Sequence, residues 1–258
     1  MTTPQFSEAN GRVAWITGAG KGIGRAVARQ LAAQGWTVAV SARTVADLES
    51  LAAACASGRI RPYRLDVTDP SATITVLDAI EAEVGRLDLA ILNAGTHQPE
   101  SAAKFSVETT RKLVEVNLMG TVNGLAPLVE RFASRRKGHI AVVASLAGYR
   151  GLPSAAAYGA TKAALINMCE ALKPELEEMG VNLSLINPGF VETPLTDKNE
   201  FPMPFLISAD RAASAIISGL AAKRFEIAVP WRFAVLMKLL RTLPDAVHFA
   251  LTRRMVNQ

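Results

Sequence analysis

Short runs rich in valine, isoleucine and leucine alternate along this chain with longer stretches in which apolar positions recur every three or four residues. Several short runs are apolar almost throughout, which is typical of strands covered on both faces of a sheet. The longer stretches have the period of helices that bury one side. The pattern predicts strands over residues 13–17, 37–41, 59–65, 87–93, 139–145, 181–187 and 226–229, and helices over residues 22–34, 44–56, 70–85, 109–136, 155–179 and 209–222.

The regular alternation predicts an α/β fold with a doubly wound parallel sheet of about seven strands flanked by helices. Because no internal repeat, low-complexity segment or linker interrupts it, we expect one domain over residues 12–230. Residues 1–11 form a predicted N-terminal tail, and residues 231–258 a predicted C-terminal helical extension of the same domain, interrupted at Pro244. Pro174 is expected to bend or shorten its helix. Ligands of such sheets bind beyond the carboxyl ends of the strands.

Composition changes this picture mainly at the C-terminus. Hydrophobic residues make up 50% of the chain, and 28 basic against 23 acidic residues give a formal net charge of +5. Seven of the bases and two of the acids lie in residues 223–258, which leaves 21 of each sign in residues 1–222. A neutral body disfavours nucleic-acid binding, which requires a basic face. The surplus charge indicates a local role for the C-terminal extension.

Three features predict a cytoplasmic protein. Residues 1–11 lack the apolar segment of a secretory signal. No run of about 18 uncharged apolar residues is present, which argues against a membrane-spanning helix. Cys55 and Cys169 both lie in predicted helices, so we expect no disulfide framework and a reducing compartment.

The loop after the first predicted strand is rich in glycine. It reads Thr17-Gly18-Ala19-Gly20-Lys21-Gly22-Ile23-Gly24 and leads into the first predicted helix. Glycine lets a backbone turn tightly and approach a pyrophosphate with no Cβ atom in the way, and the free N–H groups of the helix attract that anion. The bland alternative is a simple glycine-rich turn. The position between a first strand and a helix favours a dinucleotide site in a Rossmann fold.

The end of the second predicted strand bears on which dinucleotide binds. An NAD site usually has a carboxylate there for the ribose 2′-hydroxyl group, whereas this chain has Ser41-Ala42-Arg43 and no acid before Asp47. Arg43 could pair with a 2′-phosphate, and Lys21 could add a second charge. Both could also be ordinary solvated bases. The missing acid favours NADP (NADPH) over NAD.

Further motifs follow in order along the chain. Asn93-Ala94-Gly95 comes after the fourth predicted strand, and Pro188-Gly189 with Thr193 comes after the sixth. Between them lie Asn117, Ser145, Tyr158 and Lys162. Together with the glycine loop, these residues resemble the short-chain dehydrogenase/reductase family, in its branch of about 250 residues. The resemblance covers residues 12–229, and its departures at Leu92, Ala144 and Gly159-Ala160-Thr161 remove no group that the chemistry needs.

The resemblance implies an NAD(P)-dependent oxidoreductase acting on CH–OH groups, assembled as a homo-oligomer (dimer or tetramer). It implies a catalytic role for Asn117, which in the family holds a water that links the lysine to solvent. It also implies that Asp66 and Val67 border the adenine, although Asp66 could simply cap a helix. The predicted cofactor contacts are Gly18, Gly20, Lys21, Gly22, Ile23, Gly24, Arg43, Asp66, Val67, Asn93, Ala94, Gly95, Tyr158, Lys162, Pro188, Gly189, Val191 and Thr193.

The residue types of the predicted catalytic set also suit this chemistry on their own. Tyr158 and Lys162 are four residues apart on one predicted helix, so their side chains share a face. An ammonium group nearby is expected to lower the pKa of the tyrosine, which could then exchange a proton with a carbonyl or alcohol oxygen. Ser145 could hydrogen-bond the same oxygen. Taken singly, Ser145 could be a strand-end cap and Tyr158 a half-buried aromatic.

Three loops after the fourth, fifth and sixth strands are expected to form the substrate site: residues 96–105, 146–157 and 190–206. Their apolar content predicts a small apolar carbonyl or alcohol substrate; alternatively, the loop aromatics pack down as a lid. His97 could line the entrance, His139 is expected to be structural, and no metal site is predicted. The apolar candidates are Leu146, Tyr149, Leu152, Phe190, Leu195, Phe201, Met203, Phe205 and Leu206.

The C-terminal extension has three interpretations. Its apolar and basic residues could pack on a partner subunit, lie on a membrane surface, or dock an acidic carrier protein. The enzymatic alternative is a 3-oxoacyl-[acyl-carrier-protein] reductase, whose carrier could meet Arg135-Arg136-Lys137. A non-catalytic NADP-binding sensor is the alternative of another class, and the intact Ser145, Tyr158 and Lys162 set disfavours it.

Overall fold

The computed structural model describes residues 6, 11–198 and 203–256. It confirms the predicted parallel sheet, whose strand order is β3-β2-β1-β4-β5-β6-β7. The chain therefore leaves the middle of the sheet in opposite directions after β1 and β4, which makes their carboxyl ends a topological switch point. The strands are β1 (Val13–Thr17), β2 (Thr37–Ala42), β3 (Ile60–Arg64), β4 (Leu89–Leu92), β5 (Gly138–Val143), β6 (Val181–Pro188) and β7 (Glu226–Val229).

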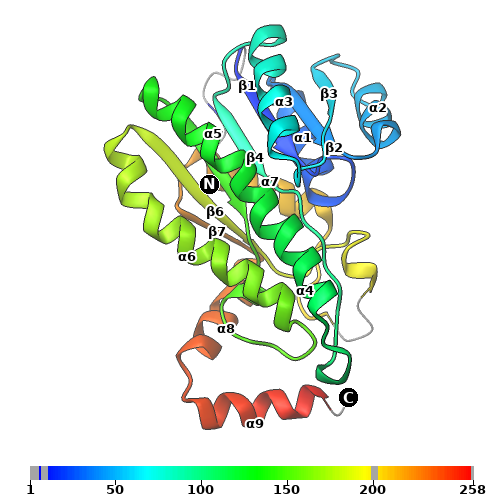
Figure 1. Cartoon of the computed structure of the whole chain (residues 1–258), viewed down its shortest axis with the longest axis vertical. Coiled ribbons are helices and arrows are strands. Elements are labelled where there is room, and N and C mark those ends of the chain that lie inside the picture. Colours follow the sequence, from blue (N-terminus) through cyan, green and yellow to red (C-terminus); the bar gives the residue numbers. More distant parts are fainter. Residues whose placement is uncertain (1–5, 7–10, 199–202, 257–258) are drawn as a thin grey trace.

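Helices cover both faces of the sheet (Figure 1). One core joins the sheet to α1 (Gly22–Ala33), α2 (Val45–Ala53) and α7 (Ala209–Ala221). The other joins it to α3 (Pro70–Glu83), α5 (Gly120–Ser134) and α6 (Ala156–Glu178). Successive side chains of a strand point to opposite faces of the sheet, so one strand contributes to both cores. In β1, Trp15 belongs to the core with α3, α5 and α6, and Ile16 to the core with α1, α2 and α7.

The long helix predicted over residues 109–136 has an irregular middle. It begins as α4 (Val107–Leu113), continues as a π-helical segment (Val114–Met119) and then becomes α5. A π segment takes one more residue per turn than an α-helix, so it changes the direction of the side chains that follow, and such segments are frequent at functional sites. The buried Asn117 lies within it.

Of the two expected effects of Pro174, the shortening of its helix is wrong, because α6 continues through this residue to Glu178, and the bend stays a prediction. Pro174 removes one backbone hydrogen bond, the one that would reach the carbonyl group of Glu170. Glu170 is exposed, so water can satisfy that carbonyl group.

The C-terminal extension forms α8 (Trp231–Thr242) and α9 (Asp245–Val256), which lie at one end of the molecule (Figure 1). α8 buries Phe233, Ala234 and Met237 in the core that contains α6. The predicted tail over residues 1–11 lies outside the described residues except for Phe6 and Gly11, and Phe6 packs edge-on against Trp36 at 4.8 Å between ring centroids. Within the described part of the chain, no helix is long and apolar enough to cross a membrane.

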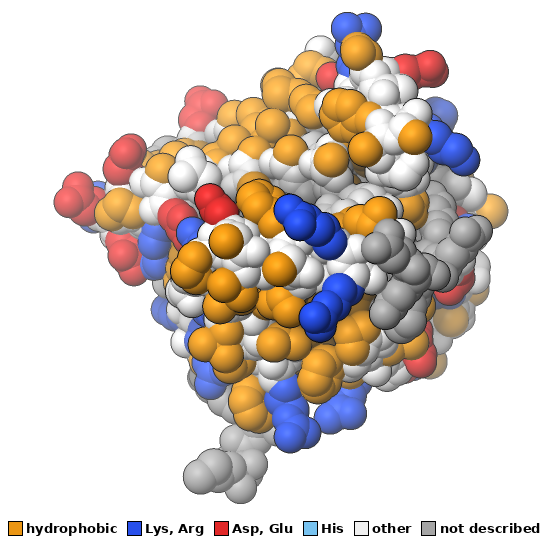
Figure 2. All heavy atoms as spheres, turned by 90° about the horizontal axis from the view of Figure 1, so that it is seen from below, with side chains coloured by type: hydrophobic (Ala, Val, Ile, Leu, Met, Phe, Trp, Pro, Cys, Tyr) orange, Lys and Arg blue, Asp and Glu red, His pale blue; other side chains and the backbone are white. Residues whose placement is uncertain are grey.

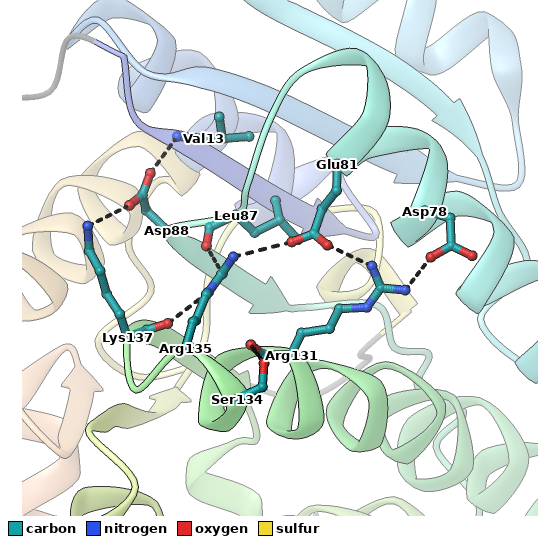
Figure 3. A network of polar contacts seen from close by, with 9 residues as sticks. All are labelled: Val13, Asp78, Glu81, Leu87, Asp88, Arg131, Ser134, Arg135 and Lys137. Carbon is teal, nitrogen blue, oxygen red and sulfur yellow. Dashed lines mark hydrogen bonds and ion pairs between the residues drawn. The ribbon is translucent and has the colours of Figure 1, made fainter.

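A network of charged groups ties α3 and α5 to the amino-terminal edge of the sheet (Figure 3). Arg131 pairs with Asp78 and with Glu81, at 2.8 Å from the Glu81 Oε2 atom. Arg135 pairs with Glu81 and donates hydrogen bonds to the carbonyl groups of Leu87 and Lys137. The Lys137 ammonium lies 3.9 Å from Asp88. Most of these cations are therefore committed to contacts within the fold.

Candidate active site

A cavity of about 680 Å³ lies beyond the carboxyl ends of the central strands. Asn93 reaches it from the end of β4, Ser145 from the end of β5 and Pro188 from β6, while Tyr158 and Lys162 reach it from α6. A second cavity of about 390 Å³ includes Trp36 and His139 in its wall and none of the predicted catalytic or cofactor residues. The larger cavity is therefore the candidate active site, at the edge of the sheet where parallel folds bind ligands.

Tyr158 and Lys162 occupy the first two turns of α6 and face the cavity together. The Lys162 ammonium donates a hydrogen bond to the Val143 carbonyl group at 3.0 Å and lies 5.8 Å from the centre of the Tyr158 ring. His97, predicted at the entrance, lines the cavity and packs edge-on against Tyr158 with 4.4 Å between ring centroids. The Tyr158 ring therefore has an ammonium group and an imidazole group as neighbours.

Ser145 lies just beyond its strand rather than within it, because β5 ends at Val143. Its Oγ atom accepts a hydrogen bond from the Ala147 N–H group at 3.1 Å and caps the short 3₁₀ turn Leu146–Gly148. The same hydroxyl group faces the Pro188 carbonyl group at 3.4 Å and lines the cavity. The cap fixes where the hydroxyl group points, so the structural and the predicted catalytic roles are compatible.

Burial works against the charged forms of Tyr158 and Lys162. It raises the pKa of Tyr158, and a hydrogen bond with Ser145 partly offsets that rise. Burial also lowers the pKa of Lys162 to about 8. The expectation that Lys162 lowers the tyrosine pKa is thus not met in this structure, because the ammonium group bonds to the Val143 carbonyl group while desolvation acts directly on the phenol.

Asn117 lies behind the cavity and holds the loop that follows β4. Its Oδ1 atom accepts from the Thr96 N–H group at 2.7 Å, and its Nδ2 group donates to the Thr96 carbonyl group at 3.0 Å and to Thr161 Oγ1 at 3.2 Å. Gly95 separates Asn117 from Lys162: a Cβ atom there would lie 3.3 Å from Asn117 Oδ1 and 3.5 Å from Lys162 Nζ. Asn117 Oδ1 and Lys162 Nζ therefore both lie close to Gly95.

Hydrogen bonds connect the glycine loop to the Asn-Ala-Gly motif. The Asn93 side chain donates to the carbonyl groups of Thr17 and Gly18 at 3.0 and 3.1 Å, and Thr17 Oγ1 accepts from the N–H groups of Asn93 and Ala94. Gly18 has a φ of +66°, and a Cβ atom there would lie 2.7 Å from the Ala94 Cα atom. Only glycine fits this close approach.

The start of α1 fits a dinucleotide. No side chain caps this end of the helix and no acidic residue lies in its first turn. Uncapped N–H groups at a helix start attract an anion such as a pyrophosphate. The segment after β6 closes on the same loop, since a Cβ atom at Gly22 would meet Thr193 at 2.9 Å.

The two residues predicted to select the cofactor, Arg43 and Lys21, differ in whether they form an ion pair. Arg43 is exposed just after β2 and forms no ion pair with any residue that the structure describes. Lys21 pairs with Asp47 at 3.6 Å, and Asp47 packs against Gly20. Sequence reasoning placed Asp47 in a helix but missed that this helix brings its carboxylate to the glycine loop.

Asp66 and Val67 lie after β3, as predicted. Asp66 accepts hydrogen bonds from the N–H group and the hydroxyl group of Thr68, at 3.1 and 2.9 Å. It does not cap α3, because Asp69 does so. The Val67 carbonyl group accepts from Asn123 of α5 at 2.9 Å, which attaches this segment to α5.

The predicted substrate wall is correct for Leu146, Leu152, Phe190 and Leu195, which line the cavity. It is wrong for Tyr149, whose ring is buried and whose hydroxyl group bonds to Glu226, because the 3₁₀ turn directs this side chain towards β7. Phe201 lies outside the described residues. Met203, Phe205 and Leu206 are absent from the described cavity lining, which instead includes Pro204.

Sequence reasoning also missed part of the wall. Phe233 and Met237 of α8 and Met255 of α9 line the cavity, although the extension was assigned only to external partners. Phe233 stacks on Phe190 and Phe205, with ring centroids 5.5 and 5.7 Å apart. The available signal was the apolar spacing of positions 233 and 237 within a helix that follows the last strand.

The comparisons with known proteins agree with this geometry. The family model for the short chain dehydrogenase matches residues 12–202. The chain belongs to the short-chain dehydrogenase family. Members of this family are oxidoreductases that bind a nicotinamide cofactor.

Related chains and structures extend the match beyond the family model. An uncharacterized oxidoreductase of Myxococcus xanthus is 36% identical over 97% of this chain and 100% of its own. A 3-oxoacyl-[acyl-carrier-protein] reductase of Thermotoga maritima is 33% identical over 73% of this chain and 77% of its own. A short-chain dehydrogenase structure from Streptomyces avermitilis has a TM-score of 0.80 and 27% identity, covering 94% of this chain and 96% of that chain. A 3-ketoacyl-(acyl-carrier-protein) reductase from Brucella melitensis, complexed with NADH, has a TM-score of 0.79 and 26% identity, covering 86% and 98%.

Proposed function

We propose that this chain is an NADP-dependent oxidoreductase that transfers a hydride between the nicotinamide and an apolar ketone, aldehyde or secondary alcohol. The observation that carries the proposal is the meeting of Ser145, Tyr158 and Lys162 in one cavity beside the glycine loop. The wall opposite them is largely apolar, with leucine, phenylalanine and methionine side chains. An apolar wall with a few polar groups favours an apolar substrate held by its single oxygen.

The chain's own residues would handle the proton. The bound cofactor supplies or accepts the hydride. Tyr158 gives its proton to the carbonyl oxygen in the reductive direction and takes one from the alcohol in the other. Ser145 donates a hydrogen bond to the same oxygen as negative charge develops on it. Lys162, with a pKa of about 8, is mostly protonated at neutral pH.

The preference for NADP is supported by Arg43. Its exposed guanidinium follows β2 and has no acidic partner within the described chain, which leaves it free for a 2′-phosphate. Asp47 supports the alternative, NAD, because its carboxylate lies beside the glycine loop and offsets the charge of Lys21. The preference between NADP and NAD therefore depends on which of these two side chains contacts the adenosine ribose.

A screen of carbonyl compounds with NADPH and NADH, and of alcohols with the oxidised forms, tests both parts of the proposal. We expect turnover of apolar substrates with NADPH, and we expect Arg43→Ala to raise the KM for NADPH by about tenfold with little change for NADH, since a charge-assisted phosphate pair is lost. Arg61→Ala, an exposed base in β3, is the matched control. Equal affinity for the two cofactors, unaltered by Arg43→Ala, contradicts the phosphate contact.

A 3-oxoacyl-[acyl-carrier-protein] reductase is the second candidate, favoured by the relatives of that name. The cluster Arg135-Arg136-Lys137 does not support it. Arg135 and Lys137 pair with acids of this chain, and Arg136 donates to the Glu178 carbonyl group at 2.8 Å. Turnover of a carrier-bound 3-oxoacyl group, well above that of simple ketones, would favour this candidate.

We also infer that residues 12–230 and the extension over residues 231–258 act as one catalytic domain, since Phe233, Met237 and Met255 complete the cavity wall. Cytoplasmic localisation and assembly as a homo-oligomer are part of the same proposal. A non-catalytic NADP-binding sensor remains the alternative of another class, and it predicts cofactor binding without turnover.

A further inference from the structure

We propose that α8 and α9 form a docking surface for an anionic lipid bilayer, beside the mouth of the active-site cavity. Figure 2 views this end of the molecule and shows hydrophobic side chains spread over it, with Lys and Arg side chains among them. The docking face consists of Trp231, Val235 and Leu239 of α8 and Val247 and Leu251 of α9, all of which are exposed and recur every four residues along their helices. A group of large apolar side chains this broad marks an interaction site rather than ordinary surface.

α8 has two apolar sides, which explains why its sequence is apolar nearly all round. Phe233 and Met237 point inward and line the cavity. Trp231, Val235 and Leu239 recur every four residues on the outer side, where Trp231 is 69% and Leu239 60% exposed. The inner contacts account for folding, so the outer row needs a separate explanation.

The charges on the extension favour an anionic partner. Its acid, Asp245, pairs with Arg150 at 2.6 Å, and its lysine, Lys238, pairs with Glu226 of β7. The four arginines, in contrast, form no ion pair with any described residue: Arg232, Arg241, Arg253 and Arg254. Arginines beside exposed apolar side chains are typical of helices that lie in a membrane interface, where apolar groups enter the acyl boundary and bases meet headgroups.

A second copy of this chain fits the docking face less well. In a two-fold symmetric interface the same patch faces itself. The unpaired arginines would then find no free acid of the extension on the copy, since Asp245 is paired with Arg150, and a surplus of like charge at an interface is unfavourable. A bilayer containing anionic lipid presents the opposite charge and an apolar layer together. The docking face therefore fits a lipid surface better than it fits its own copy.

Docking here would bring the cavity to the lipid. Met255 of α9 is 53% exposed and also lines the cavity, so the cavity wall and the outer surface meet at this residue. An apolar substrate could then pass from the bilayer into the cavity. This delivery rests on the proposed oxidoreductase function, whereas the docking itself does not.

Sedimentation of the full chain with vesicles tests the docking without any substrate. The vesicles are phosphatidylcholine alone or phosphatidylcholine with phosphatidylglycerol. We expect binding to the anionic vesicles, weakened by high salt because salt screens exposed charges, and little binding to the neutral ones. Trp231 gives a second readout: Trp15 and Trp36 are buried, so a blue shift of tryptophan emission on the vesicles reports the exposed Trp231.

Two variants separate charge from apolar contact. Arg253→Glu/Arg254→Glu should weaken binding by about tenfold or more, because each base near an anionic surface favours binding and each acid opposes it. Leu239→Ser should weaken binding and reduce the blue shift. The matched controls change exposed residues elsewhere on the molecule. Arg61→Glu/Arg86→Glu reverses one charge in β3 and one in the loop after α3, and Ile74→Ser removes an apolar side chain from α3. Both controls should bind the vesicles as the parent chain does.

Cofactor binding and circular dichroism confirm that each variant is folded. Equal binding to both kinds of vesicle, or full binding by Arg253→Glu/Arg254→Glu, overturns the proposal. A lipid-free dimer that dissociates on Leu239→Ser assigns the face to a second copy and also overturns it. So does binding of an acidic carrier protein by a chain that ignores anionic vesicles.

Discussion

The two residues at the centre of the site, Tyr158 and Lys162, both occupy positions that disfavour their charged forms. Burial raises the pKa of Tyr158 and lowers the pKa of Lys162 to about 8. Lys162 is nearly inaccessible to solvent and has one hydrogen-bond acceptor in the structure, the Val143 carbonyl group. A buried ammonium with a single acceptor costs free energy, which the fold offsets elsewhere.

That cost predicts a pH dependence of stability. The folded lysine releases its proton near pH 8, whereas the unfolded lysine keeps it to about pH 10.5. Because the unfolded state binds more protons in this window, the free energy of unfolding should rise with pH. We expect a gain of about 1 kcal/mol between pH 8 and pH 9 in the parent chain relative to Lys162→Met. Urea unfolding of the cofactor-free proteins measures it, and parallel curves for the two proteins would refute the buried charge.

At the scale of elements, one arginine connects the loop after β5 to the C-terminal extension. The Arg150 guanidinium donates to the carbonyl groups of Leu240, Arg241 and Leu243 at the end of α8, at 3.1, 3.0 and 2.5 Å, and pairs with Asp245 at the start of α9. His248 adds a contact between its Nε2 atom and the Gly151 carbonyl group at 3.1 Å. The loop that begins with Ser145 therefore also fixes where α9 lies.

Removing this arginine should loosen α9 without unfolding the sheet. We expect Arg150→Ala to speed amide hydrogen exchange in α9 by about tenfold or more, since hydrogen bonds to a charged group are worth about 1.5–3 kcal/mol. Exchange in the sheet strands should stay as it is. Arg136→Ala removes another arginine that bonds a helix-end carbonyl group, that of Glu178, and should leave α9 unchanged. Equal exchange of α9 in both variants would show that Arg150 does not hold it.

The elements that the sequence predicted well are those whose signal is local. The strands and the glycine loop follow from apolar runs and from glycines placed between a strand and a helix. The π-helical segment around Asn117 has no comparable local signal, and the side chain of Asn117 bonds to Thr96 and Thr161, which belong to other elements. Tyr149 was misplaced for the same reason: its partner Glu226 lies far along the chain.

At the scale of the whole molecule, the charge and the chemistry are separated in space. The body of the chain carries no surplus charge and holds the predicted catalytic set at the carboxyl ends of its strands. The surplus belongs to the C-terminal residues, whose helices have an inner side in the cavity and an outer side open to solvent. Sequence reasoning located the basic segment but could not show that the same helices complete the cavity, since that depends on how α8 packs against the body.

The central claim is that Tyr158 exchanges the proton in a hydride-transfer reaction, and Tyr158→Phe tests it most directly. With a substrate from the cofactor screen, we expect this change to lower kcat by about 10²-fold or more, as loss of a general acid–base group does, while cofactor affinity is retained. Tyr63→Phe, which removes a hydroxyl group bonded to Glu83 in the α3 region, should leave turnover unchanged. Turnover by Tyr158→Phe equal to that of the parent chain would contradict the account.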